Sequence, residues 1–539
     1  MKATRHRPSA CALAALLALL HGHAGAGSVD LGNELVLDYG LTASYGAGVR
    51  TGRASNALIN GPVSPLSGLP STANMDDGNR NFKRGSAVNN RLSLLGGLDL
   101  HRGAFGAVLR GSGFYDAAYH GTNDNDSAST INKSGDPNAF TDEVRRRHGQ
   151  RARLLDAYVY GDVEPAAGTK LNLRLGRQVV AWGESVFFSG IAAAQGTADA
   201  TKANVAGVEL KDILLPSEQA SAQLSIGQDL SLMGYYQFRH RPNEIDGVGS
   251  YFSYSDVVGP GAEFIRGAVG FNIPRGEDIR PRNRGQWGLG ARWRARSDLE
   301  LGLYHLRYHD KNPNVVTDFA ALPVAPFIMP TGYHIKYFDN IKATAVSLST
   351  SLGEANVAAE LSYKQGVPVL VDTVLGPAAT RTNATQLLIS GLRTFGPSAL
   401  ADQVTLVGEV GLLRVGKIKP HVDAFGGSSN QLASSLGITR NAAAVQLRAD
   451  LAYNNVFEGW DLTVPIGIAA QLSGKPAVAG AFGGLVGKGD KRVSIGVVFK
   501  RLNNLELGLA YNAFLGKADP VHRPLADRDF VSLSAKYSF

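Results

Sequence analysis

Several stretches of this chain alternate strictly between apolar and polar residues. The clearest lies at the C-terminus, where one face carries Val531, Leu533, Ala535, Tyr537 and Phe539. The opposite face carries Ser532, Ser534, Lys536 and Ser538. Residues 35–42, 445–454 and 505–512 repeat the pattern. A period of two sustained over about ten residues predicts membrane-spanning strands, with one face toward lipid and the other toward a lumen.

The connections between these stretches alternate between short and long. Short turns are predicted at 101–104, 163–169, 227–229, 296–298, 353–354, 396–402, 456–459 and 501–504. Long polar loops are predicted at 116–149, 182–217, 240–284 and 309–335. Bacterial membrane barrels have short periplasmic turns and longer outer loops. The rhythm therefore predicts such a barrel, with Phe539 on the periplasmic side.

The pattern predicts an all-β, antiparallel transmembrane barrel of about eighteen strands, with sixteen as the alternative. The sheet must close, because lipid offers no hydrogen-bond partner to an open edge. A soluble β-sandwich or β-helix would explain the alternation, but neither the short-long rhythm nor the aromatic terminus. Since no Pro-rich or Ser-rich linker divides the chain, residues 27–539 are predicted to form one domain.

The first 26 residues have the layout of a secretory signal peptide. Lys2, Arg5 and Arg7 precede an apolar segment at 10–20, and the small residues 24–26 supply a cleavage site. We therefore predict export, removal of residues 1–26 and insertion in the outer membrane of a Gram-negative cell. The only cysteine, Cys11, lies in the removed segment. The mature chain thus has no disulfide to form.

Charge and motifs argue against two broad classes of function. A net charge of +8 over 539 residues is too weak to indicate nucleic-acid binding. The sequence has no G-x-S-x-G elbow, no H-E-x-x-H motif and no complete P-loop, and no cysteine follows the signal peptide. We predict that the protein is not an enzyme and uses no cofactor.

Five segments resemble a family of proteobacterial outer-membrane barrels catalogued as domain of unknown function 1302. They are residues 74–82 (NMDDGNRNF), 90–94 (NRLSL), 155–158 (LDAY), 176–185 (GRQVVAWGES) and the closing region 525–539. The resemblance spans nearly the whole mature chain. It implies an outer-membrane location and, less directly, traffic in hydrophobic molecules such as sterols, terpenoids or lipids. It also implies a functional link to inner-membrane exporters.

Charged residues on the polar faces of the strands are predicted to line the lumen, because charge is costly in lipid. On strand 285–296 the apolar residues Leu289, Ala291 and Trp293 set the orientation, which turns the arginines inward. The predicted lumen residues are Asp38, Asp156, Arg174, Arg292, Arg294, Arg296, Glu360, Glu409, Arg448, Asp450, Glu506 and Lys536. Both signs are present, which fits either a charged aqueous channel or a salt-bridged filling.

The long loop after Trp182 contains two apolar patches, 186–188 and 213–215. Apolar residues in a long loop indicate that it is packed rather than solvated. One hypothesis is that residues 183–215 form a constriction or partial plug in the lumen. It would be lined by Gln195, Asp199, Lys202 and Glu209. A lid resting on the outer rim is the equal alternative.

Segment 74–82 combines acids, amides and a glycine in an outer loop. Asp76, Asp77 and Asn79 could ligate calcium, which takes carboxylate and amide oxygens. An Asp-Gly turn locked by an ion pair between Asp77 and Arg80 is the favoured interpretation, because the spacing of a full calcium loop is missing.

Together these features predict an outer-membrane channel or transporter for hydrophobic or amphipathic small molecules, without bond chemistry. A general hydrophilic porin is one alternative, and an outer-membrane enzyme or surface structural protein is another. Expected partners are membrane lipid and lipopolysaccharide, the small-molecule substrate, and the barrel-insertion machinery, which would read Phe539.

Overall fold

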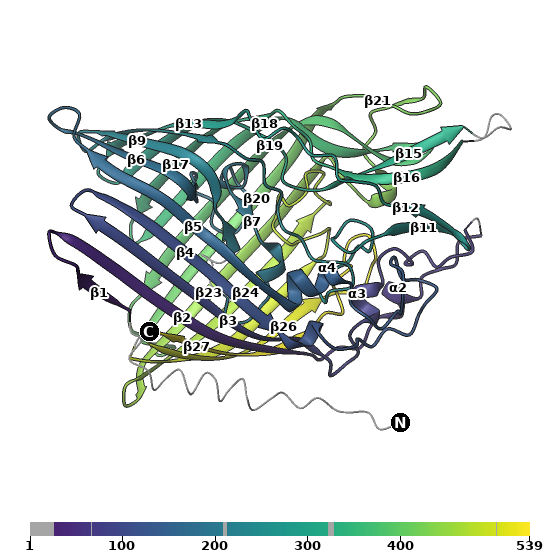
Figure 1. The fold of residues 1–539 in the computed structure, drawn as a ribbon, viewed down its shortest axis with the longest axis horizontal. Coiled ribbons are helices and arrows are strands. Elements are labelled where there is room, and N and C mark those ends of the chain that lie inside the picture. The colour runs from purple at the N-terminus through teal and green to yellow at the C-terminus, as the bar shows by residue number, and fades with distance from the viewer. Residues whose placement is uncertain (1–25, 66, 209–212, 322–327, 503) are drawn as a thin grey trace.

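The computed structural model describes residues 26–65, 67–208, 213–321, 328–502 and 504–539 of the chain. Its main element is a closed antiparallel sheet of eighteen strands (Figure 1). Each barrel strand pairs with the next one along the chain, and the last strand, β27, pairs with the first, β2. The predicted fold class and strand number are confirmed.

The barrel strands run in chain order around the ring. They are β2 (Leu35–Arg50), β3 (Ala87–Arg102), β4 (Phe105–Asp116), β5 (Gln150–Val163), β6 (Thr169–Gln178), β9 (Ser217–Ile226), β10 (Leu230–Gln237), β13 (Gln286–Arg296), β14 (Leu299–Tyr308), β17 (Ile341–Leu352), β18 (Ala355–Thr373), β19 (Gly376–Phe395), β20 (Gln403–Ile418), β23 (Asn441–Phe457), β24 (Trp460–Ser473), β25 (Lys491–Arg501), β26 (Leu505–Leu515) and β27 (Phe530–Ser538). The short strand β1 (Gly27–Asp30) pairs only with the start of β2.

The alternation of the sequence maps onto the two faces of the sheet. Leu509 and Leu533 lie opposite each other on β26 and β27, and both are about half exposed on the outside of the barrel. Ser534, the residue after Leu533, points to the inner face, where it lies opposite Gly508 of β26 and Gly46 of β2. An outer surface of exposed apolar side chains is what a lipid environment requires.

The connections follow the predicted rhythm. Every predicted short turn falls between two strands, and the C-terminus lies at the same end of the barrel as these turns (Figure 1). We call this the short-turn end and the opposite end the long-loop end. One connection at the long-loop end differs: β18 and β19 are joined by Val374 and Leu375 alone. These two strands are the longest of the barrel. They continue as a hairpin at the long-loop end, where other strand pairs are joined by a long loop.

Smaller elements lie in the connections at the long-loop end, and those of the connection between β6 and β9 lie inside the barrel. They are α2 (Asn56–Ile59), α3 (Asp77–Arg80), η1 (Ala117–Tyr119), α4 (Asp142–Val144), η2 (Arg145–Gly149), α5 (Ala192–Gln195), β7 (Thr197–Ala198), η3 (Ala200–Lys202), β8 (Leu214–Leu215), β11 (Phe264–Ala268), β12 (Phe271–Pro274), β15 (Asn314–Ala321), β16 (Ile328–Lys336), β21 (His421–Val422), β22 (Ser428–Ser429) and η4 (Ser434–Leu436). Among the described residues, no helix is long and apolar enough to cross a membrane.

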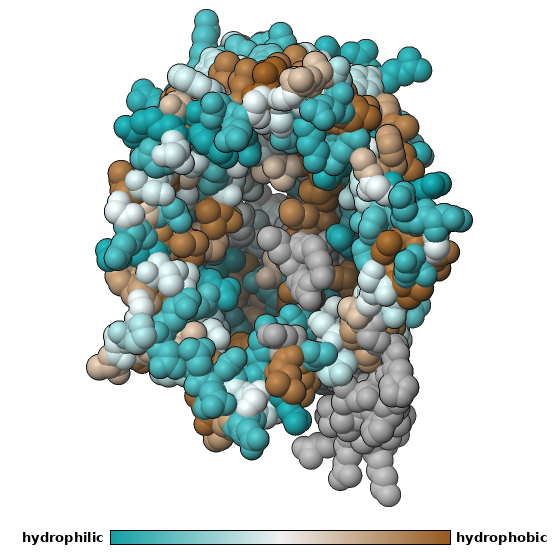
Figure 2. Space-filling model, turned by 90° about the vertical axis from the view of Figure 1, so that its left-hand side faces the viewer, coloured by the Kyte–Doolittle hydropathy of each residue, from teal (hydrophilic) through white to brown (hydrophobic). Residues whose placement is uncertain are grey.

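The largest apolar core lies inside the barrel. Lumen-facing residues of β14 to β20, including Leu306, Val369 and Val415, pack against residues of the connections β6–β9 and β24–β25. Part of the lumen is therefore filled on this side. Viewed from the short-turn end, the molecule is hollowed along its axis (Figure 2).

Candidate functional site: a strap across the lumen

The described residues of the connection between β6 and β9, 179–208 and 213–216, run inside the barrel, and we call this segment the strap. Its first anchor is Glu409 on β20, a residue that is only 1% exposed. One carboxylate oxygen accepts a hydrogen bond from the backbone N–H of Val186 at 3.1 Å, and the other accepts from Phe187 and Phe188, both at 2.7 Å. Three backbone donors thus offset the burial of one charge.

Glu360 on β18 provides a second anchor of the same kind. Its oxygens accept hydrogen bonds from the N–H of Glu184 at 3.2 Å and of Ile191 at 2.8 Å. Two glycines allow this close approach. A Cβ atom on Gly183 would lie 2.2 Å from a Glu360 oxygen, and one on Gly190 would lie 2.5 Å from the other. Gly183 also has φ +106°, which favours glycine.

The strap is tied to the facing wall by ion pairs. Arg151 and Arg153, which project from β5, both pair with Asp199 of the strap, the second at 3.4 Å. The same two arginines pair with Glu244, which belongs to the connection between β10 and β13. The backbone of Glu244 also bonds to Ala198 and Ala200 of the strap. Two loops and the β5 wall are joined at this cluster.

These anchors place the strap across the full width of the barrel. From β5 the ring proceeds through β6, β9, β10, β13, β14, β17, β18 and β19 to β20. In a ring of eighteen strands, β5 and β20 are therefore diametrically opposed. Asp199 is held at one wall and residues 186–188 at the other, so the strap crosses the lumen.

Apolar contacts fix the first part of the strap. The Trp182 ring packs edge-on against Tyr235, with centroids 5.1 Å apart, and stacks near Tyr304 at 6.1 Å. Phe188 meets Phe482 of the β24–β25 connection edge-on at 5.3 Å. The apolar patch at 186–188, which suggested a packed loop, contacts Phe482 through Phe188.

The polar residues predicted to line a constriction have other surroundings. Gln195 is fully buried, and its side-chain oxygen accepts a hydrogen bond from the N–H of Trp182 at 2.9 Å. Asp199 is also fully buried, while Lys202 is 3% exposed and lies 5.7 Å from the Phe114 ring. These three side chains therefore hold the strap in place and do not face an open passage. Glu209 lies outside the described residues.

Eight of the twelve predicted lumen charges form ion pairs, in two pairs with each other and otherwise with residues outside the predicted set. The pairs are Asp38 with His101 at 3.7 Å, Asp156 with Arg110 at 3.0 Å, Arg448 with Asp450 at 2.9 Å, and Glu506 with Lys536 at 2.8 Å. Arg292 bonds to the Tyr304 hydroxyl at 3.2 Å and lies 3.8 Å from Glu300. Arg296 is the last residue of β13, where it pairs with Asp298 of the following turn at 3.3 Å and is largely exposed. This distribution resembles a salt-bridged inner wall more than a continuous charged pore.

Two cavities lie beside the described part of the strap. The larger, about 440 Å³, reaches toward the short-turn end and is lined by Glu184, Val186, Arg294, Glu300 and Leu392 among others. The smaller, about 230 Å³, lies against the inner wall formed by β6, β9, β10 and β13. It is lined by Arg174, Trp182, Gln223, Met233 and Arg292 among others. Both cavities combine charged and apolar side chains.

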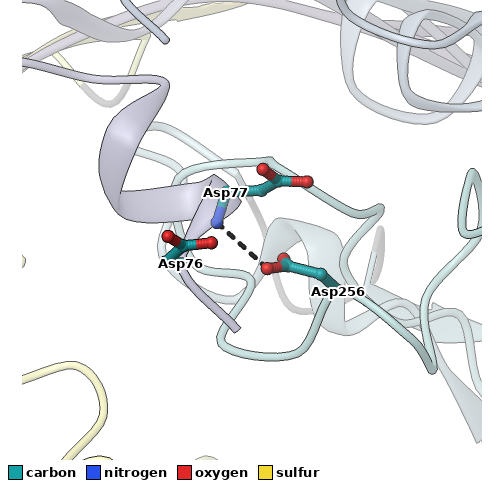
Figure 3. Close-up of side chains that lie close together, drawn as sticks. All are labelled: Asp76, Asp77 and Asp256. Carbon is teal, nitrogen blue, oxygen red and sulfur yellow. Dashed lines mark hydrogen bonds between the residues drawn. The ribbon is translucent and has the colours of Figure 1, made fainter. Parts of the chain in front are cut away.

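The outer-loop segment 74–82 forms a separate acidic cluster. Asp76, Asp77 and Asp256 each place a carboxylate oxygen within 4.8 Å of the other two (Figure 3). The backbone N–H of Asp77 donates to Asp256 at 3.0 Å. Asn79, the third residue of the predicted calcium set, does not join them. Its side-chain oxygen accepts from Arg50 at 2.9 Å.

The ion pair predicted in this segment was assigned to the wrong acid. Arg80 pairs with Asp76 at 2.5 Å and not with Asp77. The reason is that residues 77–80 form the short helix α3, which brings residues four apart onto one face. Asp77 instead accepts hydrogen bonds from Asn125 and from the N–H of Asn132. The segment thus ties several outer loops together.

Burial changes the proton affinity of these acids. Desolvation raises the pKa of Asp76 to about 6, although Arg80 opposes the change. Desolvation, followed by repulsion from Asp76, raises the pKa of Asp77 to about 7. The pKa of Asp256 is also raised, first by burial and then by its two acidic neighbours. The cluster therefore favours bound protons.

Sequence reasoning missed Arg151, Arg153 and Glu244. The two arginines stand two residues apart on a strand, which is the spacing of a single inner face. That signal was available in the sequence. Their partners come from loops more than 40 residues away, and no local pattern indicates the contact.

Several solved structures of outer-membrane proteins are similar to this chain. OccAB1 of Acinetobacter baumannii is 10% identical, with a TM-score of 0.44 over 93% of this chain and 96% of that one. OccAB4 of the same organism is 9% identical, with a TM-score of 0.43 over 93% and 98%. OmpF of Salmonella typhi, in complex with daunomycin, is 9% identical, with a TM-score of 0.38 over 95% and 100%. These similarities concern the fold alone.

No curated protein matches the chain in sequence. A family profile, in contrast, matches residues 7–539, almost the entire length. The segments singled out at 74–82, 176–185 and 525–539 all lie inside this match. The chain belongs to the family described as protein of unknown function DUF1302.

Proposed function

We propose that the protein is an outer-membrane channel that admits small amphipathic or hydrophobic molecules, of the sterol, terpenoid or lipid class. The observation that carries the proposal is the strap, which crosses the lumen and is anchored to opposite walls at Asp199 and Glu409. A narrowed lumen selects by contact with its lining and involves no bond-making step.

Two further features support the proposal. The outside of the closed barrel carries exposed apolar side chains such as Leu109, Leu175 and Leu289, which suits insertion in lipid. The cavities beside the strap combine apolar residues with charged ones, as at Val186 and Arg294. A lining of this kind can accommodate a molecule that has an apolar body and a polar group.

Deletion of residues 186–210 tests the proposal in planar bilayers. Removing the crossing segment should raise single-channel conductance at least about twofold, because the conducting cross-section increases. Deletion of the exposed hairpin tip 423–427 between β21 and β22 is the control and should leave conductance unchanged. Equal conductance in wild type and the strap deletion would contradict a lumen narrowed by the strap.

A general hydrophilic porin makes the opposite prediction for the wild-type protein. It requires high ion conductance and rapid sugar flux into liposomes before any deletion. The proposed channel requires low conductance, together with reduced uptake of a sterol or terpenoid when the gene is deleted. The two flux measurements therefore separate these functions.

A further inference from the structure

The smaller cavity beside the strap has a positive and an apolar side. Arg174 projects into it from β6 and Arg292 from β13, while Val180, Trp182 and Met233 form the apolar side. These three apolar side chains are each less than a tenth exposed. The apolar side of the cavity is therefore fixed by packing.

Arg174 is an inward-facing charge without a direct ion pair. Its guanidinium donates to the side-chain oxygen of Asn172 at 3.2 Å and lies 5.7 Å from the Tyr158 ring. Within the described part of the chain, no carboxylate lies within 4.0 Å of it. Asp162 on β5 interacts electrostatically with Arg174 but forms its ion pair with Lys170, at 3.1 Å. The guanidinium of Arg174 can therefore still receive a carboxylate from a ligand, whereas Arg448 cannot without losing Asp450.

Arg292 adds a second donor on the same cavity. Its partners are the Tyr304 hydroxyl and, at 3.8 Å, Glu300. The charge of Arg292 is therefore shared with an acid of the wall. The side chains of Asn172, Ser221 and Gln223 also line the cavity and carry hydrogen-bonding groups. Arg174 is the stronger attachment point, and Arg292 supports it.

We propose that this cavity binds the anionic group of an amphipathic molecule, a carboxylate or a sulfate, at Arg174, with the adjoining apolar part against Trp182 and Met233. This inference rests on the proposed channel function and specifies its substrate class. A volume of about 230 Å³ accommodates a head group and the carbons next to it. The cavity of about 440 Å³ is its neighbour, because Glu184 and Arg294 of that cavity lie two residues along the chain from Trp182 and Arg292, respectively.

The test uses equilibrium binding, which does not depend on conduction. The detergent-folded full-length protein is titrated calorimetrically with 4-tert-butylbenzoate and with the uncharged 4-tert-butylbenzamide. Wild type should bind the carboxylate about tenfold more tightly than the amide, the ratio expected for one charge-assisted hydrogen bond. Arg174→Gln should abolish this preference.

Two further variants separate the parts of the site. Arg448→Gln removes a lumen arginine from β23, which lies across the barrel from β6, and should retain wild-type binding. Met233→Gln should weaken binding of the carboxylate and of the amide by a similar factor, since it alters only the apolar side. Equal affinity of wild type and Arg174→Gln for the carboxylate would overturn the proposal.

Conductance measured on the same preparations distinguishes the two proposals. Tight carboxylate binding by a protein without conductance would contradict the channel function and retain the anion site. Conductance combined with equal affinity for the carboxylate and the amide would overturn the anion site and retain the channel.

Discussion

Two buried glutamates, Glu360 and Glu409, project from strands into the lumen and hold the strap there. Within the described residues, neither Glu360 nor Glu409 has a lysine or arginine within 4.0 Å. Backbone N–H groups of the strap take that place instead. A carboxylate without an ion-pair partner can remain buried in this way, because several donors replace the water it has lost.

Replacing Glu409 by Gln tests this anchoring. The amide retains only one accepting oxygen for three N–H donors, so the strap should lose about 1.5–3 kcal/mol of attachment. We expect single-channel records of Glu409→Gln to show frequent openings to a higher conductance. Glu354→Gln, at an exposed turn where Glu354 pairs with Arg393, is the matched control. Identical records for both variants would show that Glu409 does not hold the strap.

The acidic cluster of the outer loops makes the molecule sensitive to pH. Folding raises the pKa of Asp76 to about 6 and of Asp77 to about 7. The folded loops therefore bind protons more tightly than unfolded ones. The stabilisation is complete below the ordinary aspartate value of about 4 and is lost as the pH rises through about 6 to 7.

Limited proteolysis with proteinase K measures this effect. In the presence of EDTA, the outer loops should be cut faster at about pH 8 than at about pH 5, and Asp77→Asn should reduce the difference. Slower cutting at the higher pH would contradict the assigned direction. If calcium restores protection at about pH 8, the calcium hypothesis for Asp76 and Asp77 regains support, with Asp256 in place of Asn79 as the third ligand.

At the level of strands and loops, the sequence predicted what depends on neighbouring residues. The turns at 101–104 and 501–504 were placed correctly because alternation stops there, and a turn needs only local signals. The strand boundaries within 353–402 were harder to predict. The connection between β18 and β19 is a two-residue turn, so no long loop marks where one strand ends and the next begins.

The path of the strap depends on distant residues. Its apolar patch at 186–188 indicated that the loop is packed, but not against what. The partner Glu409 lies more than 200 residues further along the chain and was predicted only as a lumen charge. Arg80 was predicted to pair with Asp77 but pairs with Asp76, and the reason for this difference is local. One turn of helix, which the Asp-Gly pair does not suggest, sets the pairing.

At the scale of the whole barrel, closure depends on pairing of the last strand with the first. β27 pairs along its length with β2, and the N–H of Phe539 donates to the carbonyl of Leu41 at 2.9 Å. The Phe539 ring packs against Tyr537 with centroids 4.7 Å apart. Phe539 therefore has a structural role in addition to its predicted recognition by the insertion machinery.

Deletion of Phe539 separates these roles. Losing one ring contact and one hydrogen bond should cost at most about 3 kcal/mol, so the barrel should still refold in detergent. Assembly in cells should fall about tenfold if the machinery reads the terminal aromatic. Heat-modifiable migration on gels measures folding, and the amount in outer-membrane fractions measures assembly. Phe457→Ala, which removes an exposed aromatic at the same end, is the control. Since recognition acts only in cells, an equal loss in detergent and in cells would assign the whole effect to closure.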